Sequence, residues 1–188
     1  MAEHVILFAG PMGAGKTTAI STLSEIAVVS TEAANTERDV VDKATTTVAL
    51  DYGEISLSDD EKVRLYGVPG QRRFDIMWSI LKERARGLVL LVNNDAPDSV
   101  ALAVEYLGSF EQLIHAGGVI VGVTRVDTAP EPGLGAYRDA LSAAWPTAMM
   151  PVLSIDPRDA GQMQTALLML VAIVDARASI PAVAELSR

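Results

Sequence analysis

The sequence of 188 residues contains no cysteine, and this absence removes several kinds of chemistry. Without thiols the chain forms no disulfides, uses no thiol nucleophile and offers no cysteine ligand to a metal. Prenyl and palmitoyl groups are attached to cysteine, so neither can tie this chain to a membrane. The second residue is Ala2 rather than glycine, which also argues against N-myristoylation. We therefore expect no direct membrane anchor.

Basic residues are too few for a nucleic-acid-binding surface. The chain has 15 Lys and Arg against 24 Asp and Glu, a net charge of −9, whereas such a surface needs a basic stripe. Residues 1–4 lack a basic segment, and the apolar run over 5–9 is too short for a signal peptide or a membrane span. We expect a cytoplasmic protein with one domain over 1–188, in which 180–188 form a flexible tail.

The most specific pattern present is GPMGAGKTT at 10–18, which lies between a strand pattern and a helix pattern. Glycine, four residues and then Gly-Lys-Thr is the spacing of a phosphate-binding P-loop. The glycines let the backbone curl so that its N–H groups face phosphate oxygens. Lys16 would reach the β- and γ-phosphates, and the Thr17 hydroxyl would bind Mg²⁺. The predicted nucleotide-binding residues here are Gly10, Gly13, Ala14, Gly15, Lys16, Thr17 and Thr18.

Strand and helix patterns alternate along the rest of the chain. Strand patterns occur at 5–9, 45–56, 62–66, 87–92, 119–123 and 151–153, and helix patterns at 16–28, 74–84, 99–114, 136–145 and 158–178, with Ser99 as a capping residue. The segments 45–56 and 62–66 form a hairpin. The order predicts an α/β fold, the three-layer sandwich of P-loop NTPases: a mostly parallel sheet with one antiparallel hairpin strand and helices on both faces. Ligands of such sheets bind at the carboxyl ends of the strands.

Two further motifs carry a resemblance to a known superfamily. GVPGQRRF at 67–74 and TRVD at 124–127 follow the P-loop in the order found in Ras-like small GTPases. The chain most resembles the bacterial group of MglA-type and roadblock-associated small GTP-binding proteins, through KATTT at 43–47 and the Pro-Gly-Gln at 69–71. The resemblance implies a switch that binds GTP/GDP with Mg²⁺, hydrolyses GTP, and binds a roadblock/LC7-type regulator or activating protein and an effector. Met12 stands where fast Ras-type P-loops have glycine, and a side chain there would crowd Gln71 or an incoming arginine, so we expect slow hydrolysis without a partner.

The resemblance also implies roles around the γ-phosphate. The Gly70 N–H would bond the phosphate and Gln71 would orient the attacking water. The hydroxyl of Thr47, with Thr46 as the alternative, would bind Mg²⁺. Arg72, Arg73 and Arg38 are candidates for stabilising charge in the transition state. Gly67 stands where the superfamily has a magnesium-side Asp, so the ion would depend on Thr17, phosphate, water and another acid such as Asp51.

TRVD resembles the guanine-reading Asn-Lys-x-Asp motif. The Asp127 carboxylate would accept hydrogen bonds from the guanine N1–H and N2 amine, donors that adenine lacks in that arrangement. Arg125 would stack on the base. Thr124 lacks the amide of the motif, which weakens the expected guanine affinity and the tether to the P-loop. Ser154 occupies the place of the family's Ser-Ala-Lys loop.

Two other functions remain open. The P-loop also resembles that of nucleotide kinases, although the sequence has no Arg-rich lid and a kinase would leave Gly70, Gln71 and Asp127 unexplained. A pseudo-GTPase that binds nucleotide with little hydrolysis is favoured by Met12, Gly67 and Thr124, and Gln71 argues against it.

Overall fold

The computed structural model describes residues 2–30, 50–58, 61–68, 81 and 83–179 of the chain. Several predictions fall outside these residues: those on Arg38, Thr46, Thr47, Gly70, Gln71, Arg72, Arg73, the tail 180–188 and most of the helix over 74–84. The described end of that helix pattern, 81 and 83–84, is helical.

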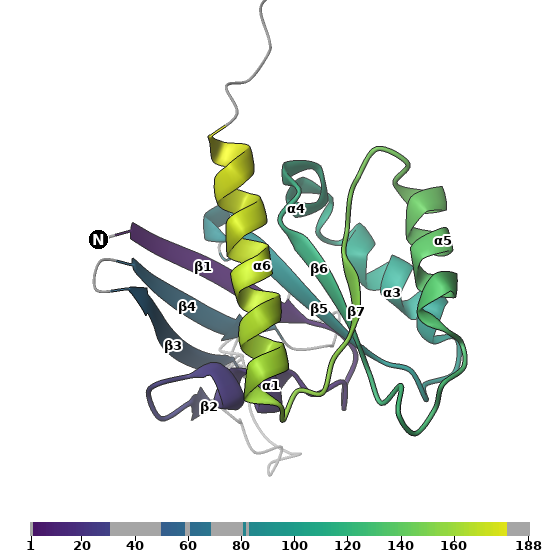
Figure 1. Ribbon diagram of the computed structural model, residues 1–188, viewed down its shortest axis with the longest axis horizontal. Coiled ribbons are helices and arrows are strands. Elements are labelled where there is room, and N and C mark those ends of the chain that lie inside the picture. Colours follow the sequence, from purple (N-terminus) through teal and green to yellow (C-terminus); the bar gives the residue numbers. More distant parts are fainter. Residues whose placement is uncertain (1, 31–49, 59–60, 69–80, 82, 180–188) are drawn as a thin grey trace, which may run out of the picture.

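A seven-stranded sheet runs through the molecule in the order β2-β3-β4-β1-β5-β6-β7 (Figure 1). The strands are β1 (Ala2–Ala9), β2 (Val29–Ser30), β3 (Asp51–Ser58), β4 (Glu61–Gly67), β5 (Gly87–Asn93), β6 (Val119–Thr124) and β7 (Val152–Ser154). In this spatial order, the neighbouring strands β4, β1, β5, β6 and β7 pair in parallel. Strand β3 is antiparallel to both β4 and β2. The predicted mostly parallel sheet with one antiparallel hairpin strand is confirmed.

Helices cover both faces of this sheet. One face carries α1 (Lys16–Leu23) and α6 (Ala160–Ala178), and the other carries α3 (Ser99–Gly108), α4 (Glu111–Ala116) and α5 (Leu134–Ala144). Alternate residues of β5 therefore enter different cores: Val89 and Leu91 pack toward α1 and α6, and Leu88 and Leu90 toward α3 and α5. Because both faces are buried, the central strands read as unbroken apolar runs.

Two predicted helices differ from the structure by more than two residues at an end, and those over 136–145 and 158–178 differ by two at most. The helix over 99–114 divides into α3 and α4, because Phe110 turns into the core and its N–H bonds the Leu107 carbonyl at 2.8 Å in a tighter turn. Ser99 is buried inside α3 and is not its cap. The helix over 16–28 ends at Leu23, because the Ser24 hydroxyl and the Glu25 N–H bond the Glu54 backbone of β3.

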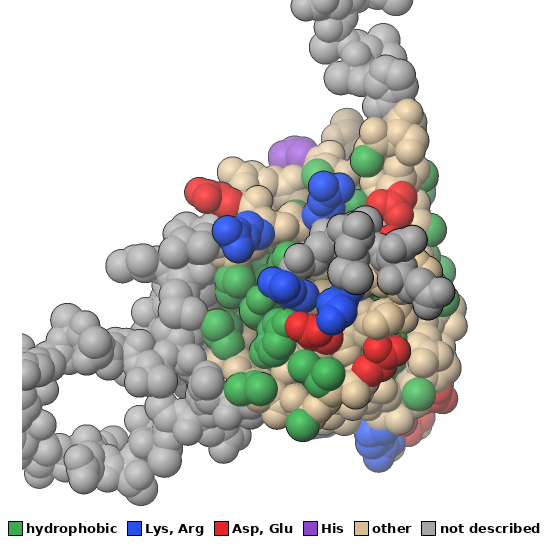
Figure 2. Space-filling view, turned by 90° about the vertical axis from the view of Figure 1, so that its left-hand side faces the viewer, with side chains coloured by type: hydrophobic (Ala, Val, Ile, Leu, Met, Phe, Trp, Pro, Cys, Tyr) green, Lys and Arg blue, Asp and Glu red, His purple; other side chains and the backbone are tan. Residues whose placement is uncertain are grey.

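The long apolar stretch of the last helix packs on the sheet. In α6 the buried side chains are Met163, Ala166, Leu167, Leu170 and Val171. Among the helices that the structure describes, none is long and apolar enough to cross a lipid bilayer. On the face turned to the viewer in Figure 2, basic side chains lie among acidic and hydrophobic ones.

Candidate functional site

The glycine-rich loop between β1 and α1 has the backbone that its sequence predicts. Gly10, Gly13 and Gly15 have φ values of 135°, 79° and 97°. A Cβ at Gly10 would lie 1.9 Å from the Leu91 carbonyl oxygen, and one at Gly15 would lie 2.6 Å from Pro157 Cγ. Only glycine fits these two positions, because both the dihedral angles and the neighbouring atoms exclude a side chain. The loop therefore passes close to β5 and to the segment after β7.

Lys16 is folded onto the loop at the start of α1. Its Nζ donates hydrogen bonds to the carbonyls of Gly10 at 2.9 Å and Pro11 at 2.8 Å. Burial lowers the pKa of the Lys16 ammonium group to about 8, and the charge of Asp51 opposes this shift. The N-cap residue of α1 is Gly15, which has no side chain to cap the helix, and none of the described residues bonds the backbone N–H groups of the first turn from its side chain. A partly buried ammonium beside a helix N-terminus favours binding of a phosphate.

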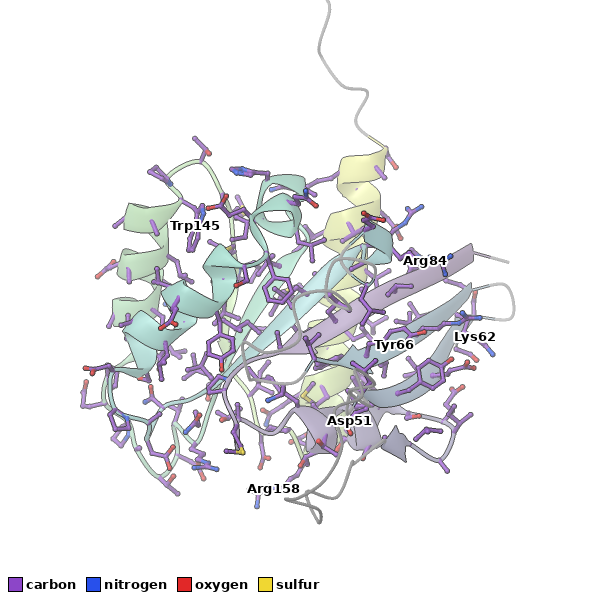
Figure 3. The ribbon with its side chains drawn as sticks, turned by 180° about the vertical axis from the view of Figure 1, so that it is seen from behind. Asp51, Lys62, Tyr66, Arg84, Trp145 and Arg158 are labelled. Atoms are coloured by element: carbon purple, nitrogen blue, oxygen red, sulfur yellow. The ribbon has the colours of Figure 1, made fainter. Side chains whose placement is uncertain are left out.

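The Thr17 hydroxyl faces an acid from a neighbouring strand. Its Oγ1 donates a 2.5 Å hydrogen bond to Oδ2 of Asp51, the first residue of β3. The sequence suggested Asp51 only as one possible acid near the phosphates, and the structure brings it to Thr17 across 34 residues of sequence. Figure 3 shows Asp51 toward the same end of the molecule as Arg158.

A cavity of about 610 Å³ lies at the carboxyl ends of β1, β6 and β7. Its lining residues are Gly13, Ala14, Gly15, Thr18, Thr124, Arg125, Val126, Asp127, Thr128, Ser154, Ile155, Asp156, Pro157, Arg158 and Gln162. The cavity thus brings together eight predicted site residues from three segments: Gly13, Ala14, Gly15, Thr18, Thr124, Arg125, Asp127 and Ser154. Gly10, Lys16 and Thr17 are not among its lining residues. Lys16 and Thr17 interact with Asp51, and Gly10 lies against Leu91 of β5.

Arg125 ties the loop after β6 to the glycine-rich loop. Its guanidinium donates to the Gly13 carbonyl at 3.0 Å and to Asp95 Oδ2 at 2.7 Å. The backbone of Arg125 has a φ of 62°, and its carbonyl accepts the Ala129 N–H at 2.9 Å, which closes the turn around Asp127. The sequence predicted that Arg125 stacks on a base, whereas the structure gives its guanidinium these two partners. A link to the glycine-rich loop is therefore made by Arg125, and the hydroxyl of Thr124 bonds Val92 instead.

The two buried polar residues Thr124 and Asn94 support the same turn. The Thr124 hydroxyl donates to the Val92 carbonyl at 3.4 Å, so it bonds the neighbouring strand. The Asn94 amide donates to the Ala129 carbonyl at 2.6 Å, and the Tyr137 hydroxyl bonds Asn94 Oδ1 at 2.7 Å. Sequence reasoning missed Asn94, because an asparagine after a strand resembles any other turn residue.

The two carboxylates of the cavity have different surroundings. Asp156 forms an ion pair with Arg158 at 2.8 Å, and this guanidinium lowers the pKa of the Asp156 carboxyl to about 2. The charge of Asp156, and to a smaller extent that of Asp127, raises the pKa of Arg158. Asp127 is exposed in the cavity and accepts no hydrogen bond from any residue that the structure describes. One carboxylate is already paired, and the other can receive a ligand.

The Asp156–Arg158 pair and Gln162 were not predicted from the sequence. The Asp156 carboxylate also accepts the Arg158 N–H at 2.9 Å, and the Asp156 N–H donates to Gln162 Oε1 at 2.9 Å. An acidic residue bonded to the backbone two residues ahead is an Asx turn, and Asp-Pro-Arg at 156–158 is the only trace of it in the sequence.

The comparisons with known proteins agree with this architecture. A family model described as "Conserved hypothetical ATP binding protein" matches residues 27–128, more than half of the chain. The match contains Asp51, Gly67 and Asp127, and it begins after the glycine-rich loop. No curated protein sequence matches the chain.

Among solved structures, the chain is similar to the G domain of the FeoB iron transporter of T. maritima. The TM-score is 0.57 at 19% sequence identity, over 94% of this chain and 99% of the other. This similarity confirms the expected P-loop G-domain fold, and the comparisons do not single out the MglA-type group. The chain belongs to the family of conserved hypothetical ATP binding proteins and folds as a P-loop α/β domain.

Proposed function

We propose that this protein binds guanine nucleotides with Mg²⁺ at the cavity and the adjoining glycine-rich loop, and hydrolyses GTP to GDP and phosphate. The observation that carries the proposal is the Asp127 carboxylate, which is exposed in the cavity and accepts no hydrogen bond from the described residues. The Arg125 contact with Gly13 holds the turn of this carboxylate against the loop that would bind phosphate. A base and a phosphate chain can therefore be bound together.

The chemistry of the base decides between guanine and adenine. A carboxylate offers only acceptors, and guanine presents two donors side by side, N1–H and the N2 amine. Adenine presents an acceptor at N1, so it would leave one oxygen of Asp127 opposite a lone pair. The description of the family names ATP, and an ATPase or a nucleotide kinase is the second candidate. The competing nucleotide in any test is consequently an adenine nucleotide.

The phosphate side has residues that fit both the anion and the cation. Lys16 and the N–H groups at the start of α1 would hold the phosphates. The Thr17 hydroxyl and the Asp51 carboxylate are hard oxygen ligands of the kind that Mg²⁺ prefers, and they lie 2.5 Å apart. A bound Mg²⁺ would be held by the Thr17 hydroxyl and the Asp51 carboxylate, and it would neutralise negative charge that develops on the phosphates during hydrolysis. Gly70 and Gln71, which the structure does not describe, remain the predicted γ-phosphate and water-positioning residues.

We also propose that hydrolysis is slow without a partner. Thr47, Arg72 and Arg73 keep their predicted roles, and a roadblock-type regulator or activating protein remains a prediction from the resemblance, as does a cytoplasmic location. Met12 supports slow hydrolysis, because its side chain is 82% exposed beside the loop, where a partner's arginine would have to approach. A single-turnover assay with the purified protein distinguishes slow hydrolysis from a pseudo-GTPase that holds GTP unchanged.

Nucleotide affinity tests the base assignment. We would measure binding of GDP, ADP and xanthosine diphosphate to the wild type and to Asp127→Asn. The variant should bind GDP about 10- to 100-fold more weakly, because it loses hydrogen bonds to a charged group. It should gain affinity for xanthosine diphosphate, whose C2 carbonyl can accept from the new amide.

Two further variants serve as controls. Asp156→Asn changes a carboxylate of the same cavity that is already paired, and it should keep the GDP preference. Lys16→Ala should weaken the binding of all three nucleotides alike, because Lys16 would contact the phosphates that they share. A wild-type protein that prefers ADP, with Asp127→Asn binding ADP unchanged, would overturn the guanine assignment and favour an ATPase or kinase.

A further inference from the structure

A side chain at the end of β4, where the resemblance places an acid, would be crowded by Asp51 and Ile20. Gly67 is buried, and a Cβ built on it would lie 3.0 Å from Asp51 Cβ, 3.1 Å from Asp51 Oδ2 and 3.0 Å from Ile20 Cδ1. These separations are shorter than ordinary van der Waals contacts. The space beside Gly67 that a side chain would enter is already filled, chiefly by Asp51.

Asp51 reaches this space because of the strand register. It is the residue paired with Gly67 in the antiparallel β3–β4 ladder, so the two positions project to the same face of the sheet. Helix α1 packs on that face, since its Ile20 side chain also lies next to the Cβ built on Gly67. A carboxylate carried by β3 thus stands where one carried by β4 would have stood.

Asp51 contacts the part of the phosphate site where a cation would bind. Its Oδ2 accepts the Thr17 hydroxyl at 2.5 Å, and Thr17 is the P-loop residue whose hydroxyl binds Mg²⁺ in proteins of this kind. Its charge also acts on Lys16 of the same loop. The Asp51 carboxylate therefore interacts with both of the residues that would contact the phosphates and the ion.

We propose that Asp51 is the acidic group that holds the divalent cation, and that it replaces across the β3–β4 pair the acid that is absent at Gly67. The carboxylate binds the ion directly or through a water, and Gly67 is glycine because Asp51 needs the space. Asp51 is the first residue of β3, whereas an acid at position 67 would be the last residue of β4. The bound cation would therefore hold the beginning of β3 in place rather than the end of β4. The inference rests on the proposed nucleotide site.

The test measures the cation rather than turnover. We would follow the release of bound fluorescent GDP over a range of Mg²⁺ concentrations, and Mn²⁺ binding to the GDP complex by electron paramagnetic resonance. Asp51→Asn keeps the shape of the side chain and removes its charge. It should raise the Mg²⁺ midpoint and the Mn²⁺ dissociation constant by about 10- to 100-fold. GDP release in the presence of EDTA should stay at the wild-type rate.

Two comparisons make the result specific. Glu54→Gln removes a carboxylate from the same strand, one that bonds Lys62 and the Tyr52 hydroxyl instead, and should leave both readouts unchanged. The exchange variant Asp51→Gly with Gly67→Asp moves the acid onto β4 and should bind the cation more tightly than Asp51→Gly alone. If the exchange variant does not fold, Asp51→Asn decides by itself.

The possible results separate this inference from the proposed function. A wild-type Mg²⁺ midpoint in Asp51→Asn overturns the inference, and so does an equal change in Glu54→Gln. If the protein binds ADP and not GDP, the guanine assignment is wrong, and the same titration with fluorescent ADP still tests Asp51. Binding of neither nucleotide overturns both.

Discussion

The phosphate side and the base side of the site are built in different ways. On the phosphate side, most of the proposed groups come from one continuous segment, 10–18, in which Lys16 bonds the loop's own carbonyls. On the base side, segments distant in the sequence are joined by side chains, such as Arg125 with Asp95 and Asn94 with Ala129. The first depends on local backbone conformation, and the second on tertiary contacts. Changes on the two sides should therefore have different consequences.

The difference predicts which variants lose all nucleotides and which lose only selectivity. A change in the backbone of 10–18 should affect every nucleotide and also the fold, because the loop lies against β5 and Pro157. A change on the base side should alter the preference between guanine and adenine. Arg125 is the exception, since it bonds both Gly13 and Asp95 and thereby joins the two sides.

The largest effect is expected for Gly10→Ala. Its methyl group would overlap the Leu91 carbonyl, a backbone atom of a central strand, at a φ of 135°. We expect a loss of roughly 3 kcal/mol or more in the free energy of unfolding, measured with urea, together with loss of all nucleotide binding. Gly135→Ala is the matched control, because that glycine lies inside α5 with nothing within 4 Å of its Cβ. It should stabilise the protein by about 0.5–1 kcal/mol.

Asn94→Ala should give the next largest effect. The change removes a buried amide and leaves the Ala129 carbonyl and the Tyr137 hydroxyl each without this partner. We expect a loss of about 1–3 kcal/mol in the free energy of unfolding and a smaller ratio of GDP to ADP affinity. Asn93→Ala, at the half-buried neighbouring position, should leave the ratio unchanged. An unaltered ratio in both variants would show that the turn around Asp127 does not depend on Asn94.

Arg125→Gln should weaken the link between the two sides. Since this ion pair is about half exposed, we expect only about a tenfold loss of affinity, shared by GDP and ADP, measured by calorimetry. The lysine of Arg125→Lys can reach only one of the two partners, so the nucleotide affinity of this variant should lie between those of Arg125→Gln and the wild type. A loss confined to GDP would mean that Arg125 contacts the base, as the sequence predicted, rather than the glycine-rich loop.

The smallest effect is expected for Arg158→Ala. The Asp156–Arg158 pair is exposed, so the melting temperature should not change measurably. The local electrostatics should change, because Arg158 holds the pKa of the Asp156 carboxyl near 2. Without the guanidinium that pKa should rise toward the ordinary value, which an NMR titration of the carboxyl carbon would record. An unchanged pKa would mean that the backbone N–H, rather than the guanidinium, sets it.

Sequence reasoning predicted the sheet well and the helices less well. Strands such as β5 and β6 were recognised because a strand buried on both faces is an unbroken apolar run. The two-residue strand β2 was not predicted, because so short a segment has no pattern of its own. The division of 99–114 into two helices was missed. Apolar residues keep their helical spacing through Phe110, but the helical backbone ends at Gly108 and starts again at Glu111. Helix ends depend on where a neighbouring strand offers hydrogen bonds, as β3 does at Ser24.

The sequence by itself determined the fold class, the phosphate-binding loop and the position of Asp127 after a buried strand. These features are local: positive φ angles require glycine, and burial requires apolar runs. Only the tertiary structure decided that Asp51 bonds Thr17 beside Gly67 and that Arg125 bonds Gly13, 112 residues away. Such contacts leave no periodic pattern, because they depend on strand register and on how loops meet at one edge of the sheet.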